Sequence, residues 1–258
     1  MSDTFVLVEQ RDGVAIVTLN RPERRNGLSA GLCNALHASL VEIAETPARV
    51  LVLRGAGRDF CVGADLSAAA AEETGSAPPA RISKAYAIPE LLHSMPQVTI
   101  ASIDGGCAGA GLGWASACDF RFASNRAKFA TAFIKVGASG DMGLAWSLMR
   151  LVGAARAREL LYFSEKFDAA QALNWGLVTR VFEPETLLEN TLDAARALAG
   201  YSAEALKTMK TNILSAEDLA LHPYVEVETA RHLHLATGPG LREGFAAFRA
   251  AQQPGGPK

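Results

Sequence analysis

Short runs of aliphatic and β-branched residues alternate with longer helical patterns through the first two thirds of the chain. Residues 5–9 and 14–19 are two such runs on either side of Arg11-Asp12-Gly13, which predicts a β-hairpin. Further strands are predicted at 50–54, 98–104, 118–124 and 177–182. Strands that alternate with helices predict an α/β core.

The clearest helical pattern follows the hairpin, where apolar residues recur at spacings of four, four and three: Leu32, Leu36, Leu40 and Ile43. Ser29 is the expected N-cap of this helix. A second predicted helix ends near Met95. Asp168 and Gln171 have the spacing of a capping box, and Gly176 fits the position after the short helix that the box begins.

Beyond residue 182 the pattern is helical, with helices predicted at 185–199, at 202–215 and over much of 223–251. We therefore expect a core domain over residues 1–195 and a helical C-terminal region over 196–258. The segment 67–83 is rich in Ala, Ser and Pro and predicts a mobile surface segment. The terminal AQQPGGPK is expected to be disordered.

Composition narrows the functional classes. With 258 residues, of which 49% are hydrophobic, the chain can bury one large core. The 25 basic and 27 acidic residues are spread along the chain without a long basic run, which argues against nucleic-acid binding. The N-terminus does not resemble a signal peptide, and no apolar stretch reaches the roughly 20 residues of a membrane span. Four cysteines without metal-ligand spacing indicate buried, reduced thiols in a cytoplasmic protein: Cys33, Cys61, Cys107 and Cys118.

The glycine-rich stretch GGCAGAGLG (105–113) lies between a predicted strand and a predicted helix. Its third glycine is at the wrong spacing for a dinucleotide-binding fold, no acidic residue follows about 20 positions on, and the Gly-Lys-Ser/Thr of a P-loop is not present. Two interpretations of this stretch stay open. It packs a helix closely on a strand, or it points backbone N–H groups at an anion.

A second turn of small residues favours the interpretation that backbone N–H groups bind an anion. GAGRDFCVGADL (55–66) also follows a buried strand and places Gly63 and Ala64 at its turn. Two such turns at the ends of neighbouring strands can direct two backbone N–H groups at one oxygen, which is the geometry of an oxyanion hole.

Asp141 stands in the run GASGDMG (137–143), among residues with little bulk. It is either the N-cap of the helix that follows or a catalytic carboxylate in a tight space. Phe133, Met142 and Trp146 are apolar neighbours that would desolvate the carboxylate and raise its pKa, which favours a role as a base.

Five stretches together resemble the enoyl-CoA hydratase/isomerase (crotonase) superfamily over nearly the whole chain: 17–29, 54–66, 103–124, 128–153 and 169–182. The resemblance implies a crotonase fold of repeated ββα units, with a C-terminal helical region that builds trimers, often paired as hexamers. It also implies an acyl-CoA thioester substrate whose oxygen is held by two backbone N–H groups while an enolate forms. No metal or redox cofactor is implied, and CoA enters as part of the substrate.

Carried onto this sequence, the resemblance assigns the N–H donors to Ala64 and Ala110. The two glutamates with which family hydratases activate water fall at Gly113 and Phe133, so both are missing. Asp141 matches a position where isomerase branches carry a working aspartate. The pattern is most similar to the branch that isomerises 1,2-epoxyphenylacetyl-CoA and 3-enoyl-CoA.

The resemblance also implies contacts with the rest of the substrate. Arg24 and Arg25 lie where the family often has a basic residue near the CoA phosphates, although a solvated loop charge is nearly as well supported. The segment with Asp65 and Leu66 matches the adenine pocket, and Gly111 begins the helix behind the oxyanion hole. Four side chains are expected to line the acyl pocket or fill the core: Trp114, Phe133, Met142 and Trp146.

These residues predict an acyl-CoA isomerase in which Asp141 moves a proton. One alternative is a hydratase or a thioester hydrolase that uses Asp141 on water. Another is an acyl-CoA-binding protein without activity. A dehalogenase is disfavoured, because its partner tryptophan and histidine correspond to Phe133 and Tyr86 here.

Overall fold

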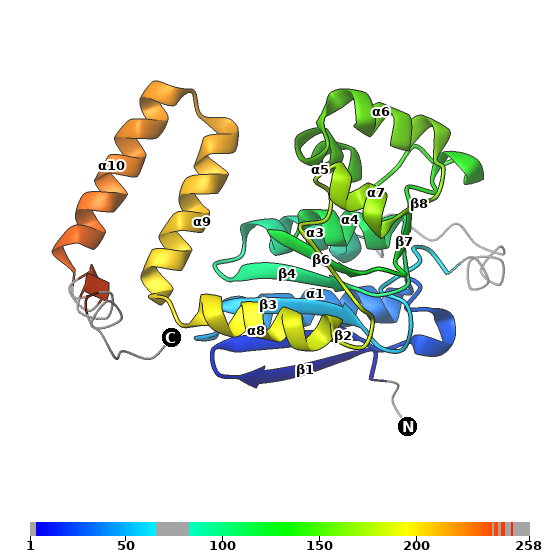
Figure 1. Ribbon diagram of the computed structural model, residues 1–258, viewed down its shortest axis with the longest axis horizontal. Coiled ribbons are helices and arrows are strands. Elements are labelled where there is room, and N and C mark those ends of the chain that lie inside the picture. Colours follow the sequence, from blue (N-terminus) through cyan, green and yellow to red (C-terminus); the bar gives the residue numbers. More distant parts are fainter. Residues whose placement is uncertain (1–3, 66–82, 239, 242–243, 246–248, 250–258) are drawn as a thin grey trace.

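The computed structural model describes residues 4–65, 83–238, 240–241, 244–245 and 249. A six-stranded sheet in the order β1-β2-β3-β4-β6-β9 runs through its centre (Figure 1). β1 and β2 form the predicted antiparallel hairpin, and every later pair in this sheet is parallel. The strands are β1 (Val6–Arg11), β2 (Val14–Leu19), β3 (Val50–Gly55), β4 (Val98–Ile103), β6 (Phe120–Ser124) and β9 (Arg180–Phe182).

A second sheet of three short strands was not predicted. It contains β5 (Gly106–Ala108), β7 (Lys128–Ala130) and β8 (Phe167–Asp168) in that order. Strands of two or three residues leave no periodicity to detect in a sequence. β5 follows β4 after a two-residue step and leads directly into the glycine-rich turn, so this small sheet positions one half of the candidate site.

The helices agree with the predicted pattern apart from their ends. They are α1 (Ala30–Ala44), α3 (Ser83–Ser94), α4 (Ala110–Ala117), α5 (Leu144–Leu151), α6 (Gly153–Phe163), α7 (Ala169–Asn174), α8 (Leu187–Ala199), α9 (Ala203–Asp218) and α10 (Leu221–Thr237), with short 3₁₀ turns at η1 (Pro22–Arg24) and η3 (Ile134–Val136). Three predicted strands are shorter than expected: β4 ends at Ile103, β6 begins at Phe120 and β9 begins at Arg180. β6 starts late because Cys118 still belongs to the C-terminal cap of α4.

The predicted helix caps are confirmed. The Leu32 N–H donates to Ser29 Oγ at 3.2 Å and starts α1. In the capping box of α7, the Gln171 N–H donates to Asp168 Oδ1 at 2.9 Å and the Asp168 N–H donates to Gln171 Oε1 at 3.1 Å. Gly176 has φ +77°, a left-handed conformation that glycine adopts readily after a helix.

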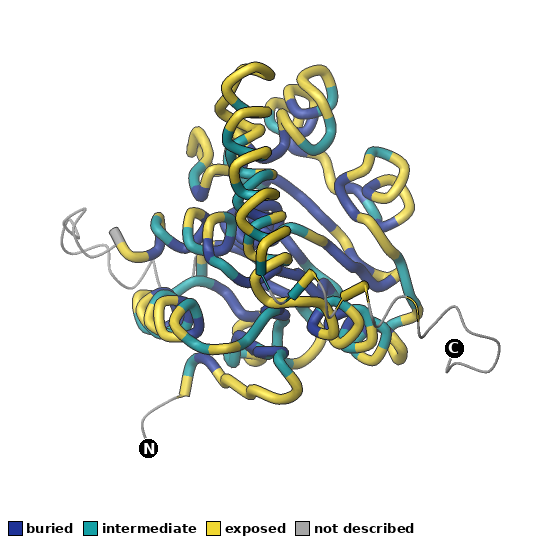
Figure 2. The backbone as a smooth tube through the Cα atoms, turned by 90° about the vertical axis from the view of Figure 1, so that its left-hand side faces the viewer, coloured by how far each residue is buried: buried dark blue, intermediate teal, exposed yellow. Residues whose placement is uncertain are grey.

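The central strands β2, β3 and β4 are buried on both faces, which explains their continuous apolar runs, whereas β1 at the edge is mostly exposed. Leu51 and Leu53 pack into a core that also contains residues of α1, α3 and α4. Val50 and Val52 point to the other face and pack with residues of α8. Figure 2 shows the buried strands in the interior and the exposed outer surfaces of the helices.

The core and the helical C-terminal region are predicted to meet between residues 195 and 196. The boundary at residue 195 falls inside α8, whose Ala195 and Ala199 are buried against the sheet. The helices that project at one end of the molecule are α9 and α10, which lie side by side (Figure 1). An amphipathic helix that packs on a sheet and one that packs against another helix have the same apolar periodicity. The sequence pattern therefore did not distinguish α8 from α9 and α10.

Some predictions fall outside the described residues. They include all of the segment 67–83 except Ser83, the first residue of α3, and the tail AQQPGGPK. The predicted helix over 223–251 is interrupted, because α10 ends at Thr237 and Gly238 follows in an extended conformation. The described residues beyond it are again helical.

Candidate active site

Two tight turns meet beside the small sheet. Gly63 has φ +88° and Gly109 has φ +54°, conformations that disfavour a side chain. A Cβ atom on Gly63 would lie 3.0 Å from the Ala108 carbonyl oxygen, and one on Gly109 would lie 3.6 Å from the Gly63 Cα atom. The two backbones therefore touch with no side chain between them. This contact brings the next residues, Ala64 and Ala110, together.

The N–H groups of these alanines are free to bind an oxygen. Ala64 forms a parallel bridge with Leu28, in which the flanking residues carry the hydrogen bonds and the Ala64 N–H points away. Ala110 is the first residue of α4, where an N–H group has no acceptor within the helix. Among the described residues, neither N–H group has an acceptor. Two such donors, one at a helix N-terminus, favour a negatively charged oxygen.

Close backbone packing explains the small residues at the start of α4. A Cβ atom on Gly111 would lie 2.4 Å from the Cys61 carbonyl oxygen. Gly111 therefore lets α4 approach the strand-like segment that leads to Ala64. A role of Gly111 in substrate binding remains a prediction.

Asp141 is not the N-cap of the helix that follows it. α5 begins at Leu144 with Gly143 as its N-cap, and no side chain caps it. The Leu144 N–H donates to the backbone carbonyl of Asp141 at 3.1 Å, so the side chain takes no part in this turn. The capping interpretation is therefore wrong. Left-handed residues on both sides, Gly140 at φ +106° and Met142 at φ +53°, set the direction of the carboxylate.

The carboxylate of Asp141 is set against apolar surroundings. Its Oδ1 atom is buried and has no hydrogen-bond partner among the described residues. Burial raises the pKa of Asp141 above the usual value for aspartate, because the charged form loses hydration in the folded chain. A carboxylate in this state is a stronger base than a free one.

The loop of Asp141 is packed against the helix of the oxyanion donor. A Cβ atom on Gly113 would lie 2.6 Å from the Met142 Cβ atom and 3.1 Å from the Met142 carbonyl oxygen. Met142, which is 4% exposed, therefore fills the space beside Gly113. At this position a longer side chain such as glutamate has no room without a shift of the loop.

Phe133 lies between the two halves of the site. Its Cζ atom would be 3.9 Å from a Cβ atom on Gly109, and its Cδ2 atom would be 3.8 Å from one on Gly140. One edge of the ring thus faces the oxyanion turn and the other faces the loop of Asp141. An aromatic ring stands where the family's second glutamate was expected.

The two tryptophans of the predicted pocket have different surroundings. Trp114 is fully buried in the core, and its Nε1 atom has no acceptor among the described residues. Trp146 is 42% exposed. The Arg150 guanidinium stacks on its ring at 3.7 Å, and the His93 ring meets it edge-on at 5.1 Å between centroids. Contact of either tryptophan with an acyl group remains a prediction.

The two candidate phosphate ligands differ in their surroundings. Arg25 forms two hydrogen bonds with Asp59, Nε to Oδ2 at 2.8 Å and Nη2 to Oδ1 at 3.0 Å. This pair raises the pKa of Arg25 and lowers that of Asp59. Arg24 is exposed on the same 3₁₀ turn.

Asp65 is also paired, because Arg21 Nη2 lies 3.2 Å from its Oδ2 atom. This ion pair fixes the segment that follows the oxyanion turn. Leu66, the other predicted residue of the adenine pocket, lies outside the described residues.

Cys33 is a neighbour of the site that the sequence did not reveal. It lies on α1 and is 7% exposed. Burial raises its pKa to about 11, the charge of Arg21 lowers it, and the charge of Asp141 raises it. The thiol is therefore near the acid and protonated at neutral pH. Its place beside the apolar stripe of α1 predicted burial but gave no sign of Asp141.

Among the described residues no group of three or more His, Cys, Asp or Glu side chains is arranged to hold a metal ion. Within the same parts of the chain, no helix has the length and apolar character needed to cross a membrane.

Comparison with known proteins shows the family to which the chain belongs. The family model described as enoyl-CoA hydratase/isomerase matches residues 9–255. The chain is 35% identical to 1,2-epoxyphenylacetyl-CoA isomerase of Escherichia coli K12, over 97% of each protein. It is 33% identical to a Rhodobacter capsulatus protein named "Probable enoyl-CoA hydratase", over 98% of each. The crystal structure of an enoyl-CoA hydratase from Bacillus anthracis superimposes with a TM-score of 0.90 at 29% identity, covering 97% of this chain and 98% of that one. The chain therefore belongs to the enoyl-CoA hydratase/isomerase family and has the crotonase fold.

Proposed function

We propose that this family member is an enoyl-CoA isomerase in which Asp141 moves a proton along the acyl chain. The supporting observation is the Oδ1 atom of Asp141, which is buried and unpaired within the described part of the chain and lies in a loop packed against the helix that begins at Ala110. A thioester oxygen bound by the Ala64 and Ala110 N–H groups lowers the cost of forming an enolate. A desolvated carboxylate beside it is suited to take the proton.

The proposed reaction needs one base and one oxyanion site. Asp141 removes a proton from C2 of a 3-enoyl-CoA, and the electrons delocalise over C2–C4 and the thioester oxygen. Asp141 then returns the proton to C4, which leaves a double bond between C2 and C3. The chemistry uses only these groups and the CoA that the substrate itself carries.

Hydration is the second candidate, because a relative bears the name of a hydratase. In this family the expected pair of glutamates would occupy Gly113 and Phe133. Met142 fills the space beside Gly113, and Phe133 places an aromatic ring at the second position. A hydratase would therefore have to activate water with Asp141 alone. This requirement favours the isomerase, in which one carboxylate suffices.

The test follows the substrate in D₂O by mass spectrometry. Straight-chain 3-enoyl-CoA and phenylacetyl-CoA-type thioesters are incubated with the wild type, with Asp141→Asn and with Asp168→Asn. Asp168 is a matched control, because its carboxylate caps α7. Deuterium uptake with migration of the double bond, lost only in Asp141→Asn, would support the proposal. Gain of water, release of free CoA, or binding without any turnover would instead favour a hydratase, a hydrolase or a binding protein.

We also propose that α9 and α10 join copies of the chain into a trimer or a pair of trimers. Large apolar side chains on this hairpin are exposed, with Met209 at 61% and Leu221 at 77%. A pocket of about 570 Å³ beside the start of α9 is lined mainly by apolar residues, most of them from α9 and from the described residues that follow α10. Burying such a surface is favourable. Light scattering should give at least three times the mass of one chain, and Met209→Glu should lower it; a monomeric wild type would refute the proposal.

A further inference from the structure

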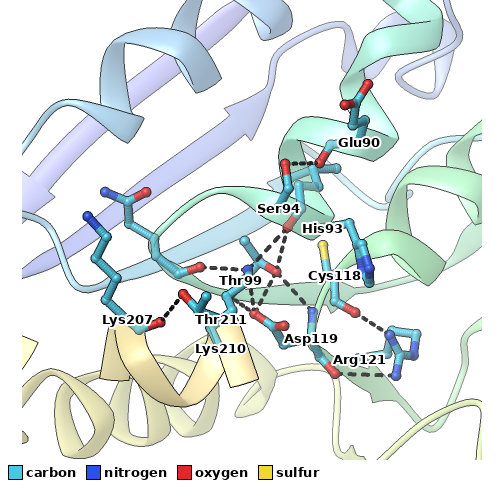
Figure 3. A network of polar contacts seen from close by, with 12 residues as sticks. Glu90, His93, Ser94, Thr99, Cys118, Asp119, Arg121, Lys207, Lys210 and Thr211 are labelled. Carbon is cyan, nitrogen blue, oxygen red and sulfur yellow. Dashed lines mark hydrogen bonds and ion pairs between the residues drawn. The ribbon is translucent and has the colours of Figure 1, made fainter. Parts of the chain in front are cut away.

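Helix α9 is attached to the core at two points on one face. Lys210 is 4% exposed, and its Nζ atom donates to Asp119 Oδ2 at 2.9 Å and to the Gln97 carbonyl at 2.8 Å (Figure 3). Glu217 Oε2 lies 2.9 Å from His93 Nε2 at the end of α3. Seven residues are about two helical turns, so Lys210 and Glu217 project from the same side of α9.

His93 makes a second contact that leads toward the candidate site. Its ring meets the ring of Trp146 nearly at right angles, at 80° and 5.1 Å between centroids. Arg150, one turn further along α5, stacks on the same indole at 3.7 Å. The side chain of Trp146 is thus held between α3 and its own helix. Contacts of this kind stabilise a single orientation of the ring.

α5 in turn supports the loop of Asp141. The helix begins at Leu144, whose N–H group donates to the Asp141 carbonyl at 3.1 Å. The carboxylate has no bond at Oδ1 among the described residues, so the backbone of this loop sets its direction. A change in the position of α5 is therefore transmitted to the acid.

We propose that Glu217, His93 and Trp146 form a positioning chain through which α9 fixes α5 and the loop of Asp141. Glu217 and His93 act through Trp146 and are positioning residues. The catalytic consequence rests on the proposed isomerase function, but the structural coupling does not. Displacement of α9 at Glu217 then loosens the acid loop, although Glu217 and Asp141 belong to different parts of the fold.

Amide hydrogen exchange measures this coupling without any assay of activity. The readout is the exchange rate of peptides covering residues 137–150 in Glu217→Gln, His93→Gln and the double variant. Glu204→Gln is the matched control, because Glu204 lies on the same helix and its carboxylate is 3.6 Å from His234 on α10. We expect faster exchange in the first two variants, no further rise in the double variant, and no change in the control. Trp146→Phe should retain slow exchange, and Trp146→Leu should not.

Turnover gives a second readout. Glu217→Gln should lower kcat about threefold with KM unchanged, the effect of losing one partly exposed contact. If wild type and Glu217→Gln exchange alike over 137–150, the positioning chain is refuted, whatever the activity. Faster exchange in all variants, Glu204→Gln included, would also refute it, since that result indicates general loosening of the hairpin. If the wild type has no isomerase activity, the proposed function fails and the exchange measurement still decides the coupling.

Discussion

Replacing Gly113 with alanine tests whether packing against Met142 fixes the loop of Asp141. Alanine normally stabilises the interior of a helix by about 1 kcal/mol relative to glycine. Here its Cβ atom would lie 2.6 Å from the Met142 Cβ atom, closer than real Cβ contacts. Met142 Cβ is fixed to the backbone, so the contact is relieved only by a shift of the loop. Overpacking of this kind costs about 1–3 kcal/mol.

The two effects together predict a net loss of about 1 kcal/mol in the free energy of unfolding. For a chain of this size that is a fall of about 2–4 °C in Tm. The shift also moves Asp141, so deuterium exchange into the substrate should fall at least about tenfold.

Met142→Gly supplies the control, because it removes the Cβ atom that the new alanine would meet. In that background Gly113→Ala should lower the Tm less than it does in the wild type, because the Cβ overlap is gone and only the 3.1 Å approach to the carbonyl oxygen of residue 142 opposes the gain in helix propensity. Thermal unfolding is measured at one pH for four proteins: the wild type, Gly113→Ala, Met142→Gly and the double variant. A rise in Tm in the wild-type background, with full exchange activity, would refute the packing argument.

Three further predictions concern other parts of the molecule. Deuterium exchange by the wild type should increase with pH through the raised pKa of Asp141, because the base form reacts, and Asp141→Asn should abolish this exchange. At neutral pH the variant should unfold at a higher temperature than the wild type, because it carries no buried charge. In acid the two should unfold alike, because the wild-type carboxyl is then uncharged in both the folded and the unfolded state. Equal Tm values at both pH values would contradict this. Lys210→Met should cost about 3 kcal/mol in denaturant unfolding, since among the described residues it leaves the Asp119 carboxylate with bonds to Thr99 alone; a loss below about 1 kcal/mol would count against the buried pair. Ser29→Ala should cost about 1 kcal/mol and Ser29→Asp should not, and an equal loss in both would exclude the cap as the cause.

Much of the fold could be predicted because its signals are local. The hairpin, the stripe of α1 with its cap at Ser29, and the capping box at Asp168 each depend on residues within a few positions of one another. The central strands are recognised in the sequence as apolar runs, because both of their faces are covered. The resemblance to the enoyl-CoA hydratase/isomerase family came from several such stretches taken together.

Tertiary structure decided the state of the candidate acid. The sequence left Asp141 as either a helix cap or a carboxylate in a tight space. The two options differ by two residues in the start of α5, and helix limits are the least certain feature of a local pattern. The left-handed Gly143 became the cap, and the carboxylate remained without a bond at Oδ1 among the described residues.

The sequence by itself predicted the strands of the main sheet, the longer helices, the starts of α1 and α7, and two turns of small residues after buried strands. Only the folded chain decided that Met142 occupies the space beside Gly113, that Cys33 comes near Asp141, and that Glu217 reaches His93. The physical reason is the separation along the chain over which each kind of interaction acts. Periodicity and capping act between neighbours along the chain, whereas these contacts join residues that are distant in sequence and depend on how whole elements pack.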